Sequence, residues 1–364
     1  AITVYPGREL DSNYSMNTVD LCPVGALTSK DFRFKMRVWF LKETKTIDVD
    51  CGTGTNITLW TREDKVYRIT PRQNDAVNSC WMPDSHRLNY KYINAETRIP
   101  QPVIRTDAEA PHRPSTWEPA LASAAEAVKR IAPNQLAIIA SGRMTNEELY
   151  MVRHLAAQIG TDMVDIVPRM GESDGMLISA DRNPNTNGAR LVLDIEPGSR
   201  LDAIREGVRS GSVKGILSLG EDLISPEAGF TAEDLDKLDY LFMTAHSANE
   251  TARHADLVLP GVTYAEKFGT MINVTGRIQR LNRAIQPIGY ARDDWQIFRD
   301  ITLLLGGNPA LKDFNSALDI LTAMSTEYGA LNGVSWGSIG DGGQPILETG
   351  VTIPVVEREK NQGR

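Results

Sequence analysis

One cysteine in this sequence stands in a context that can hold inorganic iron. Cys22 is followed at once by Pro23, and the small residue Gly25 comes two positions later. A cysteine thiolate is the usual protein ligand of an iron–sulfur cluster, and Cys-Pro is typical of the end of a [4Fe–4S] binding segment. Proline turns the chain away after the cysteine, and glycine allows close approach to a bulky core. The alternative is a buried free cysteine in a turn, because such a cluster usually takes four thiolates and this chain has three cysteines.

Other segments that could bind ligands are weaker. Residues 51–56 contain Gly52 and Gly54, but they lack a third glycine and a following lysine, and strands follow where a phosphate loop would need a helix. The polar run 181–186 is typical of a surface turn. The five histidines do not have the spacing of metal ligands. Their positions are 86, 112, 154, 246 and 254.

The length, net charge and cysteine number of the chain limit its function further. A chain of 364 residues predicts two or three domains. Its 39 basic and 47 acidic residues give a net charge of −8 without a basic block, which argues against nucleic-acid binding. An odd number of cysteines predicts no disulfide framework and fits a reducing compartment. The sequence has no apolar run of about 18 residues, so we expect no direct membrane insertion. Because it opens without methionine, we expect it to begin inside a longer gene product or after a cut.

The first third of the chain reads as β structure. Residues 32–40 alternate apolar and basic side chains, which predicts a strand with one buried face. Residues 47–72 predict short antiparallel strands, with 57–61 and 66–70 joined by a hairpin at Glu63 and Asp64. Five prolines between positions 98 and 119 predict an extended linker.

Beyond the prolines, apolar runs alternate with helical segments. Thr145 and Glu148 have the spacing of a capping box and begin a predicted helix that reaches about residue 159. Buried strands that alternate with helices predict a mostly parallel α/β sheet. The glycine-rich last 35 or so residues predict a mobile tail. The other predicted helices are 118–131, 201–209, 232–237 and 293–305, and the predicted strands are 136–140, 164–167, 215–219, 240–243 and 257–259.

Three separated segments together resemble one known family. They are Asp20-Leu21-Cys22-Pro23-Val24-Gly25-Ala26, then the stretch from Thr46-Ile47-Asp48-Val49 to Trp81, and finally Ala255-Asp256-Leu257-Val258-Leu259-Pro260 with the following residues to Trp295. In this order they closely resemble the large iron–sulfur subunit, also called the 75 kDa subunit, of respiratory NADH:quinone oxidoreductase, complex I. The third segment alone is typical of the wider molybdopterin-oxidoreductase superfamily.

The resemblance implies an α/β fold class in several parts. Residues 1–31 would be the end of a ferredoxin-like [4Fe–4S] domain, and 32–97 a small antiparallel β domain. Residues 98–116 would be a linker, 117–306 a molybdopterin-oxidoreductase-like α/β domain with a mostly parallel sheet, and 307–364 a C-terminal extension and tail.

The resemblance also implies roles for single residues. Cys22 matches the last ligand of a [4Fe–4S] cluster whose other ligands would lie upstream of Ala1. The positions of a second family cluster are Asp48, Cys51, Thr55 and Pro83 here, and with one thiol among them we expect no cluster. We expect Asp48 and Thr55 to bond the backbone amides of the turn 52–54 instead.

A molybdopterin cofactor is not expected in the α/β region. No cysteine follows position 80, so a metal thiolate is missing there. The carboxylates of Glu221 and Asp222 follow a predicted strand and would repel a diphosphate. We expect Glu266, Lys267 and Arg277 to form structural pairs at domain contacts.

The function implied is that of an iron–sulfur electron-transfer and scaffold subunit of NADH:quinone oxidoreductase, with no catalytic residues of its own. Its partners would be other subunits of the peripheral arm, including the one that holds NADH and flavin. It would lie on the cytoplasmic side of the inner membrane. Two alternatives remain: a subunit of an NAD-linked formate dehydrogenase or hydrogenase, and a cofactor-free binding module.

Overall fold

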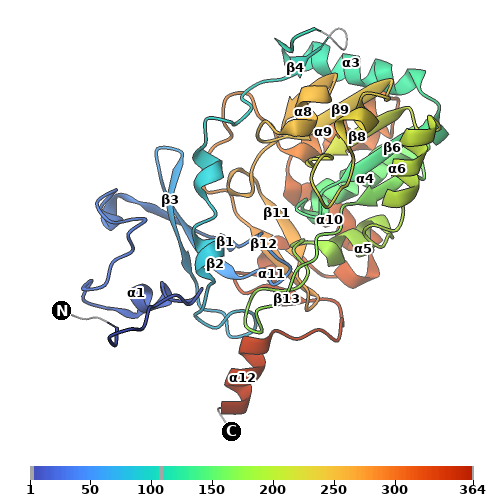
Figure 1. Ribbon diagram of the computed structural model, residues 1–364. Coiled ribbons are helices and arrows are strands. Elements are labelled where there is room, and N and C mark those ends of the chain that lie inside the picture. Colours follow the sequence, from blue (N-terminus) through green and yellow to red (C-terminus); the bar gives the residue numbers. More distant parts are fainter. Residues whose placement is uncertain (1–3, 106–109, 363–364) are drawn as a thin grey trace.

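The computed structural model describes residues 4–105 and 110–362. Figure 1 shows a large sheet with helices on both faces, beside a small antiparallel sheet near the N-terminal segment. A third sheet lies between these two parts. The fold is therefore mixed α/β, as the sequence predicts.

The small sheet contains β1 (Lys42–Ile47), β2 (Asn56–Arg62) and β3 (Lys65–Pro71), all antiparallel. The predicted hairpin between β2 and β3 is confirmed. Its turn residues Glu63 and Asp64 have φ of 50° and 55°. Positive φ at both positions gives a turn whose twist matches that of the flanking strands.

The large sheet has the order β5-β4-β10-β9-β8-β6-β7. The pairings from β10 to β7 are parallel, which confirms the predicted mostly parallel sheet. Its strands are β4 (Val103–Ile104), β5 (Arg113–Pro114), β6 (Leu136–Ala140), β7 (Val164–Ile166), β8 (Gly215–Leu219), β9 (Tyr240–Ala245) and β10 (Leu257–Pro260).

The antiparallel edge of this sheet corrects the predicted linker. Val103 and Ile104 of β4 pair with β10, and β5 pairs with β4. The prolines do not prevent this, because at the edge of a sheet proline's missing N–H can face away from the ladder. Residues 106–109 of the predicted linker lie outside the described residues.

Two apolar cores cover the two faces of the large sheet. Side chains alternate along β6, so Leu136 and Ile138 join one core and Ala137 and Ile139 the other. Helices α3, α4, α9 and α10 contribute to the first core, and α6, α7 and α8 to the second. The helix bounds are α1 Asn17–Leu21, α2 Asp84–Arg87, α3 Trp117–Arg130, α4 Asn146–Ile159, α5 Thr186–Leu193, α6 Leu201–Ser210, α7 Ala232–Leu235, α8 Glu250–His254, α9 Asp294–Leu304, α10 Ala317–Glu327, α11 Trp336–Ile339 and α12 Pro354–Gln362.

A third sheet, which the sequence analysis does not predict, joins the two parts. It contains β11 (Gly269–Ile272), β12 (Arg277–Leu281) and β13 (Gln344–Pro345). Met271 of β11 and Leu281 of β12 share one core with Ile47 and Leu59 of the small sheet. The small sheet therefore buries its apolar face against residues more than 200 positions away.

The predicted strand at 32–40 is wrong. This segment forms turns and a short 3-10 helix, Val38–Phe40, and Phe34 has a φ of 65°. An alternating pattern makes a strand only where a neighbouring strand pairs with it, and among the described residues β1 pairs with β2 alone. Basic side chains instead stack on the aromatic rings, as Arg68 does over Phe32 at 4.7 Å from the centroid.

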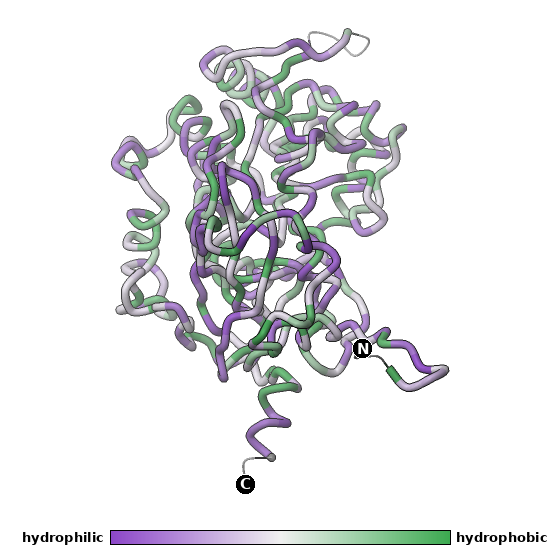
Figure 2. The backbone as a smooth tube through the Cα atoms, turned by 90° about the vertical axis from the view of Figure 1, so that its left-hand side faces the viewer, coloured by the Kyte–Doolittle hydropathy of each residue, from purple (hydrophilic) through white to green (hydrophobic). Residues whose placement is uncertain are grey.

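The C-terminal residues do not simply form a tail. Ile353, Val355 and Val356 are buried against Val77 and Leu177, which lie far away in the sequence. Figure 2 shows that α12 stands off from the body and that its later turns are hydrophilic. The prediction of a mobile tail rested on the glycine-rich composition. It is wrong for residues 353–356, because their apolar side chains are packed against the rest of the protein.

Candidate functional site

Cys22 lies directly after α1, and buried polar contacts fix that helix. Asn17 donates from Nδ2 to the Met82 carbonyl at 2.8 Å and accepts from the Met82 N–H at 3.1 Å. Arg87 of α2 donates to the Asp20 carboxylate at 2.6 Å. The position of Cys22 is therefore set by the segment 82–87.

The surroundings of the Cys22 thiol suit a sulfur that carries negative charge. Cys22 is half-buried, whereas the alternative interpretation expects a fully buried cysteine. The backbone N–H of Leu27, followed by those of Ala26 and Val24, lowers the pKa of the Cys22 thiol. Gly25 has a φ of 66°, which favours glycine and shapes the turn that brings these amides to the sulfur. A cluster ligand must be a thiolate, so one such ligand fits here.

Cys22 also lines a cavity of about 630 Å³ between the N-terminal segment, β3 and α2. Apolar side chains from residues 27–38 line part of it. Of the three cysteines, only Cys22 is among the described residues that line this cavity. Nearby Leu21, Val24 and Phe34 are largely exposed, as in a surface that packs against further protein.

Three of the four positions at which we expect no cluster, Asp48, Cys51 and Thr55, lie in the loop between β1 and β2. Cys51 is buried, its Sγ lies 3.7 Å from the Leu177 carbonyl oxygen, and burial raises the pKa of its thiol to about 11. The thiol is therefore protonated at neutral pH. Pro83 precedes α2 and offers no ligand atom. Thr55 is buried, and its hydroxyl has no partner within the described chain.

The predicted hydrogen bonds of Asp48 and Thr55 to the amides of the turn 52–54 are wrong, because neither side chain makes one among the described contacts. Asp48 accepts from the N–H of Asp50 at 3.2 Å and contacts the ring of His86, so its carboxylate is used outside the turn 52–54. The backbone N–H of Gly52 donates instead to the Asp181 carbonyl at 2.8 Å. The Gly52 amide thus bonds a residue of the α/β region that lies far away in the sequence, whereas the Gly54 N–H donates to the Cys51 carbonyl within the loop at 3.4 Å.

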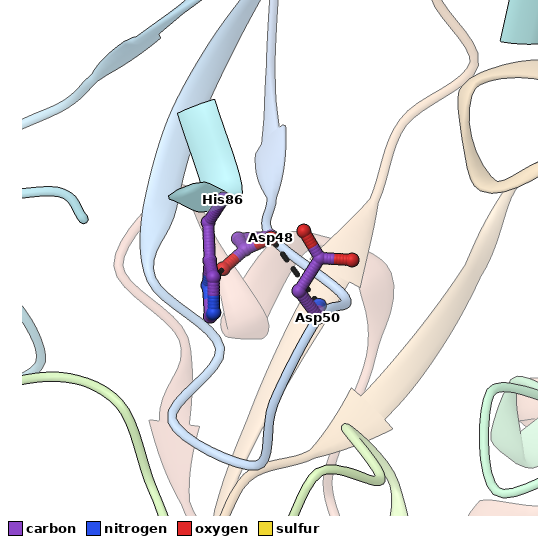
Figure 3. A group of neighbouring side chains, drawn as sticks. All are labelled: Asp48, Asp50 and His86. Atoms are coloured by element: carbon purple, nitrogen blue, oxygen red, sulfur yellow. Dashed lines mark hydrogen bonds and ion pairs between the residues drawn. The ribbon is translucent and has the colours of Figure 1, made fainter. Parts of the chain in front are cut away.

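The structure brings two further residues, Asp50 and His86, to Asp48 (Figure 3). His86 Nδ1 lies 2.6 Å from Asp48 Oδ2, and one ligand atom from each of the three residues falls within 4.8 Å of the others. Burial alone would lower the pKa of His86, but the Asp48 carboxylate outweighs it and raises that pKa to about 9. Burial, and then the charge of Asp48, raises the pKa of Asp50 to about 7. The sequence analysis missed this group because His86 lies 38 positions from Asp48 along the chain.

The polar run 181–186 is not a surface turn. Asn183 and Asn185 are buried, and their amides donate to the carbonyls of Val167 and Met144 at 2.9 and 2.8 Å. The run closes the carboxyl end of the large sheet, because these amides satisfy carbonyls that follow β6 and β7.

The predicted repulsion at the end of β8 is also corrected. Glu221 is buried and forms a two-contact ion pair with Arg169, and Asp222 accepts from the Thr251 hydroxyl at 2.6 Å. The Glu221 charge is therefore balanced within the protein. The crevice at this end of the sheet, lined by His246 and Lys267 among others, has a volume of about 110 Å³.

The predicted structural pairs are confirmed at two of three positions. Glu266 pairs with Arg98 at 2.6 Å, and Lys267 pairs with Glu148 at 2.7 Å, all four side chains being buried. Arg277 donates to the carbonyl of Gly343 rather than to an acidic side chain. The described part of the chain contains no helix long and apolar enough to cross a membrane.

Three family models match the chain in succession. Residues 1–28 match "NADH-quinone oxidoreductase subunit 3, ferredoxin-like domain", and residues 41–91 match "NADH-ubiquinone oxidoreductase NDSU1/NuoG-like, 4Fe-4S domain". Residues 182–302 match "Molybdopterin oxidoreductase". The order agrees with the resemblance read from the sequence.

Similar proteins carry names from one complex. The NADH-ubiquinone oxidoreductase 78 kDa subunit of Candida albicans is 27% identical, over 86% of this chain and 60% of that protein. The NADH-quinone oxidoreductase G subunit of Rickettsia prowazekii is 35% identical, over 82% of this chain and 45% of that protein. The chain thus spans less than two thirds of the length of these relatives. Among solved structures, acetylene hydratase from Pelobacter acetylenicus shares the fold, with a TM-score of 0.58, 10% identity, and coverage of 81% and 73% of the two chains.

Proposed function

We propose that this chain, a homologue of the large iron–sulfur subunit of NADH-quinone oxidoreductases, is an iron–sulfur electron-transfer and scaffold subunit of such a complex. Cys22 supplies one thiolate of a [4Fe–4S] cluster, and the other ligands come from outside the 364 residues. The cluster, when bound, supplies one-electron transfer. The chain itself holds Cys22 in place and makes no bond to substrate.

The single observation that carries this proposal is the setting of Cys22. Backbone N–H groups directed at a sulfur stabilise the thiolate and tune the potential of a bound cluster. Leu27 and Ala26 provide such groups. The contact of Arg87 with Asp20 holds α1, the helix that directly precedes Cys22. The thiol and the backbone N–H groups that lower its pKa therefore belong to one turn.

The α/β region serves, in this proposal, as a scaffold without a molybdopterin. The crevice beside His246 and Lys267, about 110 Å³, is well below the roughly 300–1,000 Å³ of usual ligand sites, whereas a second cavity beside Arg169 and Asn183 has about 550 Å³. Buried pairs such as Arg169 with Glu221 occupy the carboxyl end of the large sheet. The region would support the arm of the complex mechanically.

The partners follow from the same homology. We propose contacts with other subunits of the peripheral arm, including the subunit that binds NADH and flavin, and a place on the cytoplasmic face of the inner membrane. The exposed apolar residues Leu21, Val24 and Phe34 supply a surface for such contacts.

The test uses the complete native complex with Cys22→Ala in this subunit. We expect the loss of about four irons per complex, the content of one [4Fe–4S] cluster, together with one electron paramagnetic resonance signal. Cys80→Ala is the matched control, because Cys80 is exposed, and should keep both. Unchanged iron and signals in the Cys22 variant would refute the assignment.

A further inference from the structure

We propose that Asp48, Asp50 and His86 form a mononuclear site for a divalent transition-metal ion of the Zn²⁺ class. The site lies where the loop after β1 meets α2, and it is separate from Cys22. It does not depend on the proposed electron-transfer function, because it requires only residues of this chain.

The geometry of the three side chains is close to that of a coordinated ion. Their ligand atoms lie within 4.8 Å of one another, and Asp48 Oδ2 is 2.6 Å from His86 Nδ1. Tetrahedral Zn²⁺ with bonds of about 2.1 Å holds its ligand atoms about 3.4 Å apart. Asp48 Oδ2 and His86 Nδ1 would therefore move apart by less than about 1 Å, and the ion would replace the proton that they share.

The backbone around the site is fixed before any ion binds. The Asp48 N–H donates to the Thr55 carbonyl at 2.8 Å, which continues the pairing of β1 and β2. His86 belongs to α2, whose next residue, Arg87, is buried and bonded to Asp20. Ligands on such elements lose little conformational entropy when an ion binds.

The charges of the site leave room for a cation. Asp48 and Asp50 bring two carboxylates, and His86 is the only basic side chain that forms an ion pair with either of them in the described chain. Arg143 and Arg182 influence the site only from a longer range. Asn89 donates to Asp50 Oδ1 at 2.8 Å, and Oδ2 has no partner among the described contacts. A divalent ion would compensate the second carboxylate.

An independent observation at the same place is the Thr55 hydroxyl. Thr55 is 1% exposed, and its Oγ1 has no hydrogen-bond partner in the described structure. Thr55 and Asp48 lie one residue beyond the last pair of β1 and β2, Ile47 with Asn56, and the Asp48 N–H donates to the Thr55 carbonyl. Continuing the register by one residue places them opposite each other, and directly opposite residues project from the same face of a strand pair. A water bound to the ion in the open fourth position would give this hydroxyl a partner.

The ligand types select the class of ion. Imidazole suits Zn²⁺ and Fe²⁺, and carboxylates add oxygen ligands that these ions accept. An iron–sulfur cluster needs thiolates, and the Cys51 sulfur instead contacts the Leu177 carbonyl. The site is therefore a different kind of centre from a cluster, although it lies among residues 41–91, which match a 4Fe-4S domain model.

The experiment titrates the full 364-residue chain, stripped with a chelator, with Co²⁺ followed by absorption and with Zn²⁺ followed by calorimetry. We expect one ion per chain, with Co²⁺ displaced by Zn²⁺. Asp50→Asn and His86→Gln should each weaken binding at least tenfold. The matched control is His254→Gln, because His254 forms a similar pair with Asp236 at 2.8 Å on the surface, and it should bind as the parent does.

Any of three results would overturn the proposal. One is no stoichiometric binding by the parent chain, which would leave Asp48 and His86 as a purely structural pair. Another is undiminished binding by the Asp50→Asn variant. This variant should fold even if the His86 variant does not, because Asp50 is partly exposed. Circular dichroism checks the folding of both variants. A sulfur-to-Co²⁺ charge-transfer band that Cys51→Ser removes would also refute this set of ligands.

Discussion

Arg87 donates to the Asp20 carboxylate at 2.6 Å and so joins residues 67 positions apart. The neighbouring residue, His86, contacts the Asp48 carboxylate at 2.6 Å. One short helix thus supports both the Cys22 segment and the proposed metal site.

Arg87→Ala should loosen the Cys22 segment. Arg87 is buried, and its loss leaves Asp20 and Asn17 without a charged donor, so we expect a cost of about 1.5–3 kcal/mol in the free energy of unfolding. Urea unfolding measures this, and faster hydrogen exchange at residues 17–22 would show where the effect lies. Arg253→Ala, which breaks an exposed pair with Glu250, should change stability little. Equal effects of the two variants would contradict the prediction.

The buried pair of Arg98 and Glu266 should be among the most sensitive contacts. Glu266 also accepts from Thr263 N–H at 2.7 Å and Ile288 N–H at 3.2 Å, so its carboxylate organises several segments. Arg98→Met should cost about 3–5 kcal/mol, because it leaves a buried carboxylate without its partner. Chemical denaturation measures the change. Arg190→Met, which removes an exposed pair, is the control; a similar loss there would refute the role of burial.

Glu147 should make stability depend on pH. Burial raises the pKa of its carboxyl from 4.5 to about 7, despite bonds from the Thr270 N–H and hydroxyl at 2.8 Å. The folded state therefore binds more protons than the unfolded state between these values, and stability falls as pH rises from about 4.5 to 7.

Glu147→Gln tests this dependence. Asp293 and Asp294 act in the same direction and His246 in the opposite one, so the informative quantity is the difference between parent and variant. Relative to the variant, the parent should lose roughly 1–3 kcal/mol between pH 5 and 8. Unfolding at several pH values measures it, with the exposed Glu126→Gln as control. A difference that does not change with pH would contradict the assignment.

Gly188→Ala should disturb the buried amide network at the start of α5. A Cβ at this position would collide with Asn146 Oδ1 and Asn185 Oδ1, and Asn185 also accepts from the Ile272 N–H at 2.7 Å. We expect a loss of about 1–3 kcal/mol, measured by thermal and urea unfolding. Gly329→Ala, where a Cβ meets nothing within 4 Å, should be neutral or slightly stabilising. Full stability of the Gly188 variant would show that the network can move aside.

Sequence by itself determined the features that depend on neighbouring residues. The capping box of Thr145 and Glu148 forms as predicted, because its hydrogen bonds close within three residues. The hairpin at Glu63 and Asp64 and the apolar run of β6 are equally local, since turn chemistry and burial act on adjacent positions. The three segments at Cys22, at 46–81 and at 255–295 together also indicated the family, because the order of such motifs is read directly from the sequence.

Only the tertiary structure decided the features that need a distant partner. The alternation at 32–40 predicted a strand, but no described strand pairs with it. The run 181–186 is polar yet buried, because Asn183 and Asn185 satisfy carbonyls of other segments. Asp48, Asp50 and His86 meet only when α2 packs beside the loop after β1. Burial and charge pairing depend on positions in space, and no spacing along the chain records them.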